Sequence, residues 1–299
     1  MKTVKRANSV INRVLAHLPP KEKSKPAIAA TAGIKEAANK KEQETELSIP
    51  DVSELKYMIE ALKAPAQHAL PDAPIQTLVA VTLDESGSMS HGFRQTMKGY
   101  NDQMNALRKT SVKIGCRVLQ TTFNSRARIV ADDVATDFIV PLSAETYNPR
   151  GGTALYDTVA AVVKRLLAHP LAHQDNTSIL LMITTDGEDT SSIQWNASKC
   201  LTEFRSLMKA VSTNQRWTVA LAGPDKMLRQ FSDEMSVDPE NVAAFVPTDL
   251  KSRADAMGSS VHAMNSYTAM RAMGTKKVSM MYDGTESGAL AKAILEKAP

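Results

Sequence analysis

Two runs with few polar side chains set the strongest limit on the fold of this chain. The first extends from Leu78 to Leu83 and the second from Ser178 to Thr184. Runs of this length without alternation are typical of strands that are buried on both faces. Between such runs, apolar residues recur at helical spacing, so strands and helices alternate along the chain. This order predicts an α/β fold, a doubly wound and mostly parallel Rossmann-like sheet with helices on both faces.

The individual elements can be placed from the same patterns. Asp51 and Glu54 form a capping-box signature before one helix, and Thr248-Asp249 precedes the last long helix, whose expected apolar face holds Leu250, Met257, Val261 and Met264. We expect strands at 78–83, 112–122, 127–130, 179–184, 217–222 and 242–246, helices at 93–107, 156–168, 195–211, 227–235 and 287–297, and extended segments at 137–142 and 276–282.

Composition divides the chain into a central domain and two flanking segments. Residues 19–48 are charged and lack apolar periodicity, which predicts a linker that buries too little surface to fold alone. We therefore expect an N-terminal extension over 1–74, with short helices around the linker, a domain over 75–272 and a C-terminal tail over 273–299. We also expect the tail to pack with the N-terminal segment.

Charge and hydropathy argue against several classes of function. The net charge of +4 is too small to predict nucleic-acid binding. The sequence contains no run of about 18 apolar residues, so we expect no membrane span. The basic start lacks the apolar core of a secretory signal, so we expect a cytoplasmic protein. Cys116 and Cys200 fit a reducing compartment.

A loop rich in oxygen donors follows the first apolar run. It contains one carboxylate and two hydroxyls at alternate positions, and a glycine between the hydroxyls allows a sharp bend. Hard oxygen ligands without His or Cys suit a hard cation such as Mg²⁺. The three donors are Asp84, Ser86 and Ser88.

This loop resembles the metal-ion-dependent adhesion site of von Willebrand factor A (vWA) domains. Two further parts of that site have matching residues in the same order: Thr153 follows two glycines, and Asp186 follows the second apolar run. Together with the absence of a secretory signal, this resemblance is to the intracellular bacterial or phage type of the family. The resemblance implies the vWA fold, in which the three loops meet in space.

The resemblance also implies a function and a ligand set. A divalent ion, Mg²⁺ or alternatively Mn²⁺ or Ca²⁺, would bind an acidic side chain, Glu or Asp, of a partner protein. Thr153 would engage the ion chiefly when that partner carboxylate is present. The implied metal ligands are Asp84, Ser86, Ser88, Thr153 and Asp186, and the expected charges on the partner-binding rim are Glu85, Glu188 and Asp189.

Two other functions stay open at this point. The chain could be an accessory subunit of a separate AAA+ ATPase, either chelatase-like or remodelling, because intracellular vWA proteins often accompany such machines and this chain has no Walker motif of its own. A metal-dependent hydrolase is less favoured, because the sequence shows no nucleophile–His pair and no phosphate loop. His91 is the one candidate base near the loop. We therefore expect a binding protein and not an enzyme.

Overall fold

The computed structural model describes residues 46–70, 73–111, 114–196, 200–279 and 281–296. The short helix expected before the linker, and most of the linker at 19–48, lie outside these residues. Of that linker, Leu47 is buried, and its backbone N–H donates to the carbonyl oxygen of Ala127 at 3.2 Å.

The centre of the molecule is a six-stranded sheet with the order β3-β2-β1-β4-β5-β6. All neighbouring strands are parallel except β2 and β3, which are antiparallel. The predicted doubly wound, mostly parallel sheet is therefore confirmed. The strands are β1 (Gln76–Asp84), β2 (Gly115–Phe123), β3 (Ala127–Ala135), β4 (Thr177–Thr184), β5 (Trp217–Pro224) and β6 (Val242–Phe245).

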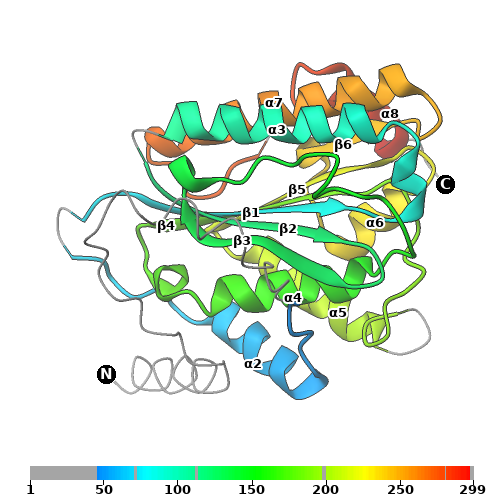
Figure 1. Cartoon of the computed structure of the whole chain (residues 1–299). Helices are drawn as coiled ribbons and strands as arrows, with labels where there is room; N and C mark the ends of the chain where they lie inside the picture. The colour runs from blue at the N-terminus through cyan, green and yellow to red at the C-terminus, as the bar shows by residue number, and fades with distance from the viewer. Residues whose placement is uncertain (1–45, 71–72, 112–113, 197–199, 280, 297–299) are drawn as a thin grey trace, which may run out of the picture.

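Helices cover both faces of this sheet (Figure 1). On one side lie α3 (Phe93–Thr110) and α7 (Leu250–Ala272), and on the other lie α2 (Val52–Lys63), α4 (Leu155–Leu167) and α5 (Leu201–Thr213). Two shorter helices, α6 (Leu228–Met235) and α8 (Glu286–Glu296), pack against each other beside the strands β5 and β6.

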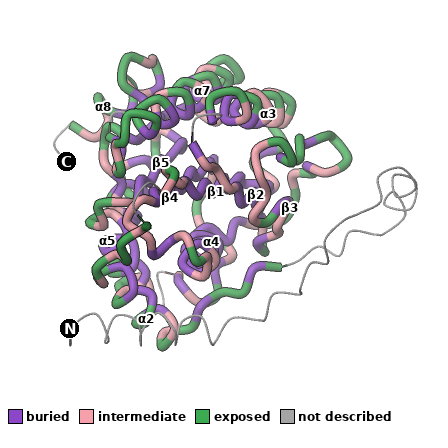
Figure 2. Tube along the Cα trace, turned by 90° about the vertical axis from the view of Figure 1, so that its left-hand side faces the viewer, coloured by how far each residue is buried: buried purple, intermediate pink, exposed green. Residues whose placement is uncertain are grey.

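Each face of β1 contributes to a different hydrophobic core. Leu78 and Ala80 face the core under α4 and α5, whereas Val79, Val81 and Leu83 face the core under α3 and α7. Figure 2 shows the buried strands between the two helical layers. This arrangement explains why the run at 78–83 contains almost no polar residues.

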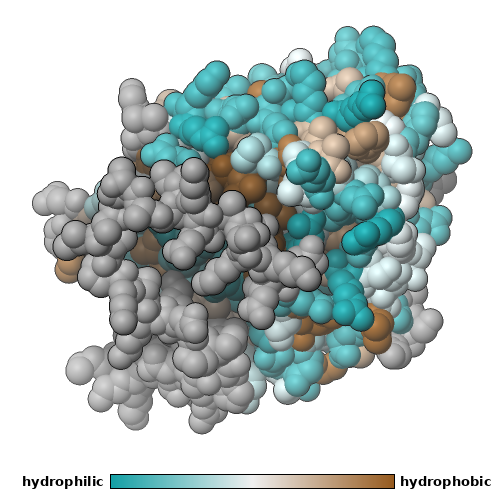
Figure 3. All heavy atoms as spheres, viewed as in Figure 1, coloured by the Kyte–Doolittle hydropathy of each residue, from teal (hydrophilic) through white to brown (hydrophobic). Residues whose placement is uncertain are grey.

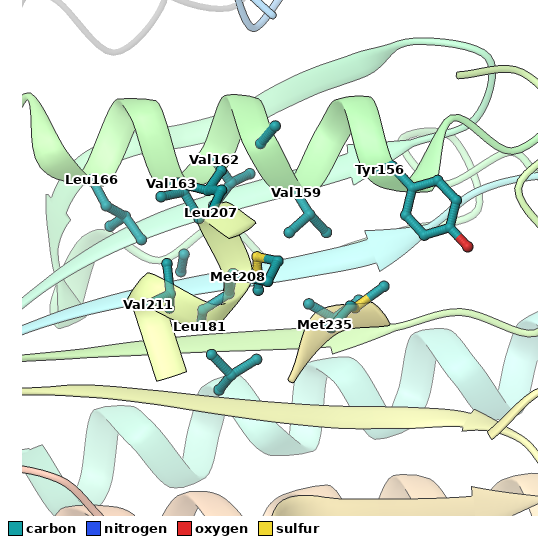
Figure 4. Packing of buried hydrophobic residues seen from close by; sticks show 14 of the residues in the cluster. Tyr156, Val159, Val162, Val163, Leu166, Leu181, Leu207, Met208, Val211 and Met235 are labelled. Atoms are coloured by element: carbon teal, nitrogen blue, oxygen red, sulfur yellow. The ribbon is translucent and has the colours of Figure 1, made fainter. Parts of the chain in front are cut away.

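The core under α4 contains the larger set of buried side chains (Figure 4). Val159 and Val163 of α4 and Leu207 and Met208 of α5 are all fully buried against the sheet. Few large apolar side chains remain exposed, and the view in Figure 3 shows a mainly hydrophilic described surface with small hydrophobic patches. No helix of the described ranges has the length and hydrophobicity needed to cross a bilayer.

The capping box before α2 is confirmed. The Asp51 carboxylate accepts from the N–H of Glu54 at 2.8 Å, and the Glu54 carboxylate accepts from the N–H of Asp51 at 3.0 Å. The predicted cap of α7 is also present, since the Asp249 carboxylate accepts from the N–H groups of Lys251 and Ser252. Both helices therefore begin where their cap residues predict.

The helix expected over 195–211 begins later than predicted. Trp195 lies in an irregular loop before α5, because its backbone N–H donates at 2.9 Å to the buried carboxylate of Asp157 on α4. The apolar pattern that suggests an earlier start reflects the burial of Trp195 in the core rather than helix formation. On α7, Met257 and Met264 are buried as expected, but Leu250 is 42% exposed.

Two segments expected to be extended are irregular. Residues 136–138 form a short 3₁₀ helix, and the chain after it is held by Gln120, whose side-chain oxygen accepts from the N–H of Val140. Residues 276–279 contain bends without strand pairing. The strand expected at 127–130 is longer than predicted and ends at Ala135, and the strand expected from 112 begins at Gly115.

The C-terminal tail packs on the central domain, and most of the N-terminal segment that it is expected to contact lies outside the described residues. The described contacts of α8 are chiefly with β6, α6 and α7, on the part of the molecule distant from α2 in Figure 1. Ala291 of α8 is fully buried in the same core as α4 and α5. The tail therefore packs against the sheet and the helices that cover it.

Candidate metal site

The two aspartates of the predicted site lie at the carboxyl ends of two neighbouring strands. Asp84 is the last residue of β1, and Asp186 follows β4 by two residues. The two strands are parallel neighbours, with Leu83 paired to Thr184. From β1 the chain continues to β2, which is the neighbour of β1 on one side, whereas β4 is its neighbour on the other side. The carboxyl ends of β1 and β4 therefore mark the point where the strand order reverses. Open α/β sheets bind ligands at such a point.

Three loops meet there and are joined by backbone hydrogen bonds. The N–H of Gly87 donates to the carbonyl oxygen of Gly151 at 3.1 Å, and the N–H of Thr190 donates to that of Thr153 at 2.9 Å. The Thr153 N–H in turn donates to the Thr190 hydroxyl at 2.9 Å. We call these the first loop (84–90), the threonine loop (149–154) and the aspartate loop (185–195). The three predicted segments are therefore brought together.

Glycines permit this close approach of the loops. Gly151 has a φ of 75°, in the left-handed region that glycine favours. A Cβ on Gly152 would stand 2.0 Å from the Ser191 hydroxyl oxygen, so a side chain at this position would require the Ser191 hydroxyl to move. The two glycines before Thr153 therefore have structural roles that place its hydroxyl.

The predicted hydroxyl donors form one cluster with Asp186. The hydroxyl oxygens of Ser86 and Ser88 are 3.0 Å apart, and the Ser88 hydroxyl donates to Asp186 Oδ1 at 2.5 Å. Thr153 faces the same space, because a Cβ built on Gly187 would stand 3.2 Å from Ser88 Oγ and 3.8 Å from Thr153 Oγ1. Together with Asp84, these residues border one small region that is lined with oxygen atoms.

Asp84 is the most deeply buried carboxylate of the cluster. It is fully buried, and its oxygens accept from the Ser86 N–H at 2.7 Å and from the Thr185 hydroxyl at 2.6 Å. Burial raises the pKa of Asp84 to about 6, against the opposing effect of these two hydrogen bonds, and the nearby Asp186 adds to the rise. Sequence reasoning missed Thr185, although it stands directly before Asp186.

Arg253 on α7 is a second member of the site that sequence reasoning missed. Its Nη2 donates to Asp186 Oδ2 at 2.7 Å, and both side chains are only 1% exposed. A signal was present in the sequence, because Arg253 lies three residues after Leu250 and four before Met257, on the stripe assigned to the buried face. A charged residue in that stripe needs a buried partner.

The expected rim charges have different places. Glu85 is 6% exposed, so it is not a rim residue; its carboxylate accepts from the Asn148 N–H and pairs with Arg128 at 3.0 Å. Asp189 is half-buried and accepts from the N–H of Tyr156, at the start of α4. Of the three predicted rim residues, only Glu188 is exposed. The candidate base His91 contacts the carbonyl oxygen of Thr248 at 3.2 Å.

The residues present fit a hard divalent cation. No group of three or more His, Cys, Asp and Glu side chains suited to a metal occurs in the parts of the chain that the structure covers, so any ion here depends on hydroxyl oxygens as well as carboxylates. Oxygen donors of this kind are those that Mg²⁺, Mn²⁺ and Ca²⁺ accept.

Comparison with known proteins gives similarities to solved structures only. No protein-family model matches the chain, and no curated protein matches it. A von Willebrand factor type A protein from Catenulispora acidiphila is 17% identical, with 64% of this chain and 43% of that chain covered and a TM-score of 0.41. The PilB minor pilin from Streptococcus sanguinis is 11% identical, with 69% and 64% covered and a TM-score of 0.45.

A third similar structure is described with a bound metal. Proximal thread matrix protein 1 from the mussel byssus, with a zinc-occupied MIDAS motif, is 15% identical, with 63% of this chain and 45% of that chain covered and a TM-score of 0.41. This chain thus spans less than two thirds of the length of each of the three proteins.

Proposed function

We propose that this protein is a divalent-metal-dependent protein-binding module of the vWA type. A dication, with Mg²⁺ preferred and Mn²⁺ or Ca²⁺ as alternatives, would bind at the cluster and take a Glu or Asp side chain of a partner protein as a further ligand. The residues that would hold the ion are Asp84, Ser86, Ser88, Thr153 and Asp186.

The convergence of the three loops is the observation that carries this proposal. Residues separated by as many as 98 positions, Ser88 and Asp186, are in direct hydrogen-bond contact at the carboxyl edge of the sheet. Hydroxyl ligands are neutral, so they leave a bound dication electrophilic and able to attract an anionic ligand. The ion would supply that attraction, while the chain holds the donors in place and keeps Asp84 out of water.

A hydrolytic role has less support. The candidate base, His91, hydrogen-bonds the backbone carbonyl oxygen of Thr248, which lies outside the oxygen cluster. We therefore propose a non-enzymatic role. A separate AAA+ ATPase is one class of partner that this role accommodates, and affinity capture with Mg²⁺ and with EDTA distinguishes it from other partners.

The proposal is tested first by metal-dependent stability. A ligand that binds only the folded state stabilises it by about 2.7 kcal/mol at a hundredfold excess over its dissociation constant. The purified chain should therefore melt at a higher temperature in MgCl₂ or MnCl₂ than in EDTA. Ser88→Ala should reduce the difference, because it removes one hydroxyl donor. Ser206→Ala, on an exposed turn of α5, is the matched control.

The outcome can contradict the proposal in a simple way. If the wild-type chain melts at one temperature in Mg²⁺, Mn²⁺, Ca²⁺ and EDTA, and if isothermal titration detects no binding, the cluster is not a metal site. If the metal binds but proteins captured on the immobilised chain are the same in EDTA, the metal does not mediate partner binding.

A further inference from the structure

Arg253 brings a permanent positive charge to the edge of the oxygen cluster. Its guanidinium donates to Asp186 Oδ2 at 2.7 Å and to the Pro247 carbonyl oxygen at 3.1 Å. The guanidinium carbon also lies 5.3 Å from the ring centroid of Phe245 on β6. These contacts fix the charge in one place, and because the side chain is 1% exposed, bulk solvent screens it little.

The two oxygens of Asp186 have separate partners. Oδ1 accepts from the Ser88 hydroxyl and so faces the cluster, whereas Oδ2 accepts from Arg253. The guanidinium therefore neutralises the charge of Asp186 but leaves Oδ1, the oxygen that faces the hydroxyl groups of the cluster, without a contact to Arg253. A cation held by the cluster would share the Asp186 carboxylate with Arg253, so the two positive charges would repel each other in a buried site.

Because of Arg253, the site would carry a net positive charge once a dication is bound. Two ionised carboxylates, Asp84 and Asp186, balance a dication. The guanidinium then leaves one positive charge in a buried place, where an uncompensated charge is costly. A single carboxylate from outside would remove that cost, whereas a neutral ligand would not.

We propose that Arg253 is a specificity-determining residue of the site: it weakens binding of the dication and strengthens binding of a carboxylate to the loaded site. The inference rests on the proposed function and deepens it, because it names a singly charged carboxylate as the ligand for which the site is balanced. It also predicts that the two affinities change in opposite directions when the charge is removed. A purely structural role for Arg253 would weaken both.

The test compares three variants on α7. Arg253→Gln removes the charge but retains a donor, Arg253→Lys keeps the charge, and Lys251→Gln removes a charge from an exposed side chain two residues away. The probes are MgCl₂ by isothermal titration, and then acetate added to the Mg²⁺-saturated chain at constant ionic strength. Acetate binding is followed by the backbone amide signals of Gly87, Gly152 and Gly187, with acetamide as the neutral control.

The expected changes have opposite signs. Arg253→Gln should bind Mg²⁺ at least tenfold more tightly and acetate at least tenfold more weakly than wild type, since each tenfold change corresponds to about 1.4 kcal/mol. Arg253→Lys and Lys251→Gln should stay within about threefold of wild type for both ligands. If Arg253→Gln is folded and binds Mg²⁺ no more tightly than wild type, the inference is overturned.

Folding of the variant is itself informative. Without Arg253, Asp186 is a buried charge with its counter-ion removed, so Arg253→Gln should lose stability in EDTA. A bound dication should replace the missing charge. A variant that is unfolded in EDTA and folded in Mg²⁺ supports the inference, and one that is unfolded in both overturns it.

Failure of this inference is distinguishable from failure of the proposed function. If wild type binds no dication but Arg253→Gln does, the native site is not a metal site, yet Arg253 opposes metal binding as inferred. If neither binds a dication, both are wrong. If wild type binds a dication and both ligand affinities fall in Arg253→Gln, the proposed function stands and the inference is wrong.

Discussion

Gly99 of α3 lies against Met257 of α7 so closely that a Cβ on Gly99 would stand 2.2 Å from the Met257 Cβ. The two helices cover the same face of the sheet, and each is connected to the candidate site. The first loop leads into α3, and α7 carries Arg253. The position of the guanidinium next to Asp186 therefore depends on how closely these helices pack.

The first prediction concerns this contact. Gly99→Ala should destabilise the chain by about 1–3 kcal/mol, because the Cβ of Met257 is fixed to the backbone and cannot move aside without shifting α7. This loss from the clash should exceed the gain of about 1 kcal/mol that alanine brings to a helix interior, so the net free energy of unfolding should still decrease. Urea denaturation in EDTA measures the net effect.

Gly258 on α7 is the matched control for that substitution. A Cβ at Gly258 would meet no atom within 4 Å, so Gly258→Ala should stabilise the chain by up to about 1 kcal/mol. If both substitutions stabilise, α3 and α7 are packed less closely than the structure shows.

The second prediction concerns the anchor of the aspartate loop. Asp157 of α4 is 2% exposed, and its carboxylate accepts from the backbone N–H groups of Ile193, Gln194 and Trp195. Asp157→Ala leaves these donors without an acceptor and should cost about 2–4 kcal/mol. Faster amide hydrogen exchange at 193–195 would locate the effect. Asp102→Asn, at an exposed pair with Lys98, is the control and should be nearly neutral; unchanged exchange in Asp157→Ala would contradict the anchoring role.

Much of the fold follows from the sequence because its strongest signals are local. The run at 78–83 predicts a strand buried on both faces, and β1 is that strand. Asp51 and Asp249 mark the starts of their helices by a cap geometry that involves only neighbouring residues. The helix start predicted at Trp195 is wrong because the backbone N–H of Trp195 is held in a loop by the carboxylate of Asp157, which is distant in the sequence.

In the candidate site, too, local features follow from the sequence, whereas contacts between distant residues do not. Its oxygen donors can be predicted from short motifs, since each loop keeps its pattern within a few residues. The partners of those donors cannot, because Arg253 reaches Asp186 across 67 positions and the interaction depends on α7 lying over the sheet. The rim position predicted for Glu85 is wrong for a similar reason: its partner Arg128 stands on β3, 43 positions away.

The third prediction concerns pH in the absence of metal. The pKa of Asp84 rises from 3.8 to about 6 on folding, mainly because the carboxyl is buried. The folded state therefore holds this proton more tightly than the unfolded state. The resulting stability is fully present below the unfolded pKa and is lost as the pH rises through about 6.

Asp84→Asn isolates this effect, because it removes the titration. The stability of the variant relative to wild type should improve by on the order of 2 kcal/mol between about pH 4.5 and about pH 7.5, as wild type loses its proton. Denaturation in EDTA at both pH values measures it, with Asp102→Asn as the control. A stability difference that is the same at both pH values would mean that Asp84 titrates normally in the folded chain.

The fourth prediction separates two ligands of the candidate metal site. Asp84→Ala removes a carboxylate and should abolish the rise in melting temperature that Mg²⁺ produces. Its stability in EDTA should change little, because the loss of acceptors for Ser86 and Thr185 is offset by the removal of a buried charge. Under the proposed function, Thr153→Ala should leave some of the Mg²⁺ effect but weaken capture of partner proteins more, because we propose that this hydroxyl engages the ion chiefly when a partner carboxylate is present. The measurements are thermal melting and affinity capture, each in Mg²⁺ and in EDTA, with Ser206→Ala as the control. If Asp84→Ala responds to Mg²⁺ as wild type does, the ion binds elsewhere, and if Thr153→Ala retains Mg²⁺-dependent capture, the threonine hydroxyl has no part in partner binding.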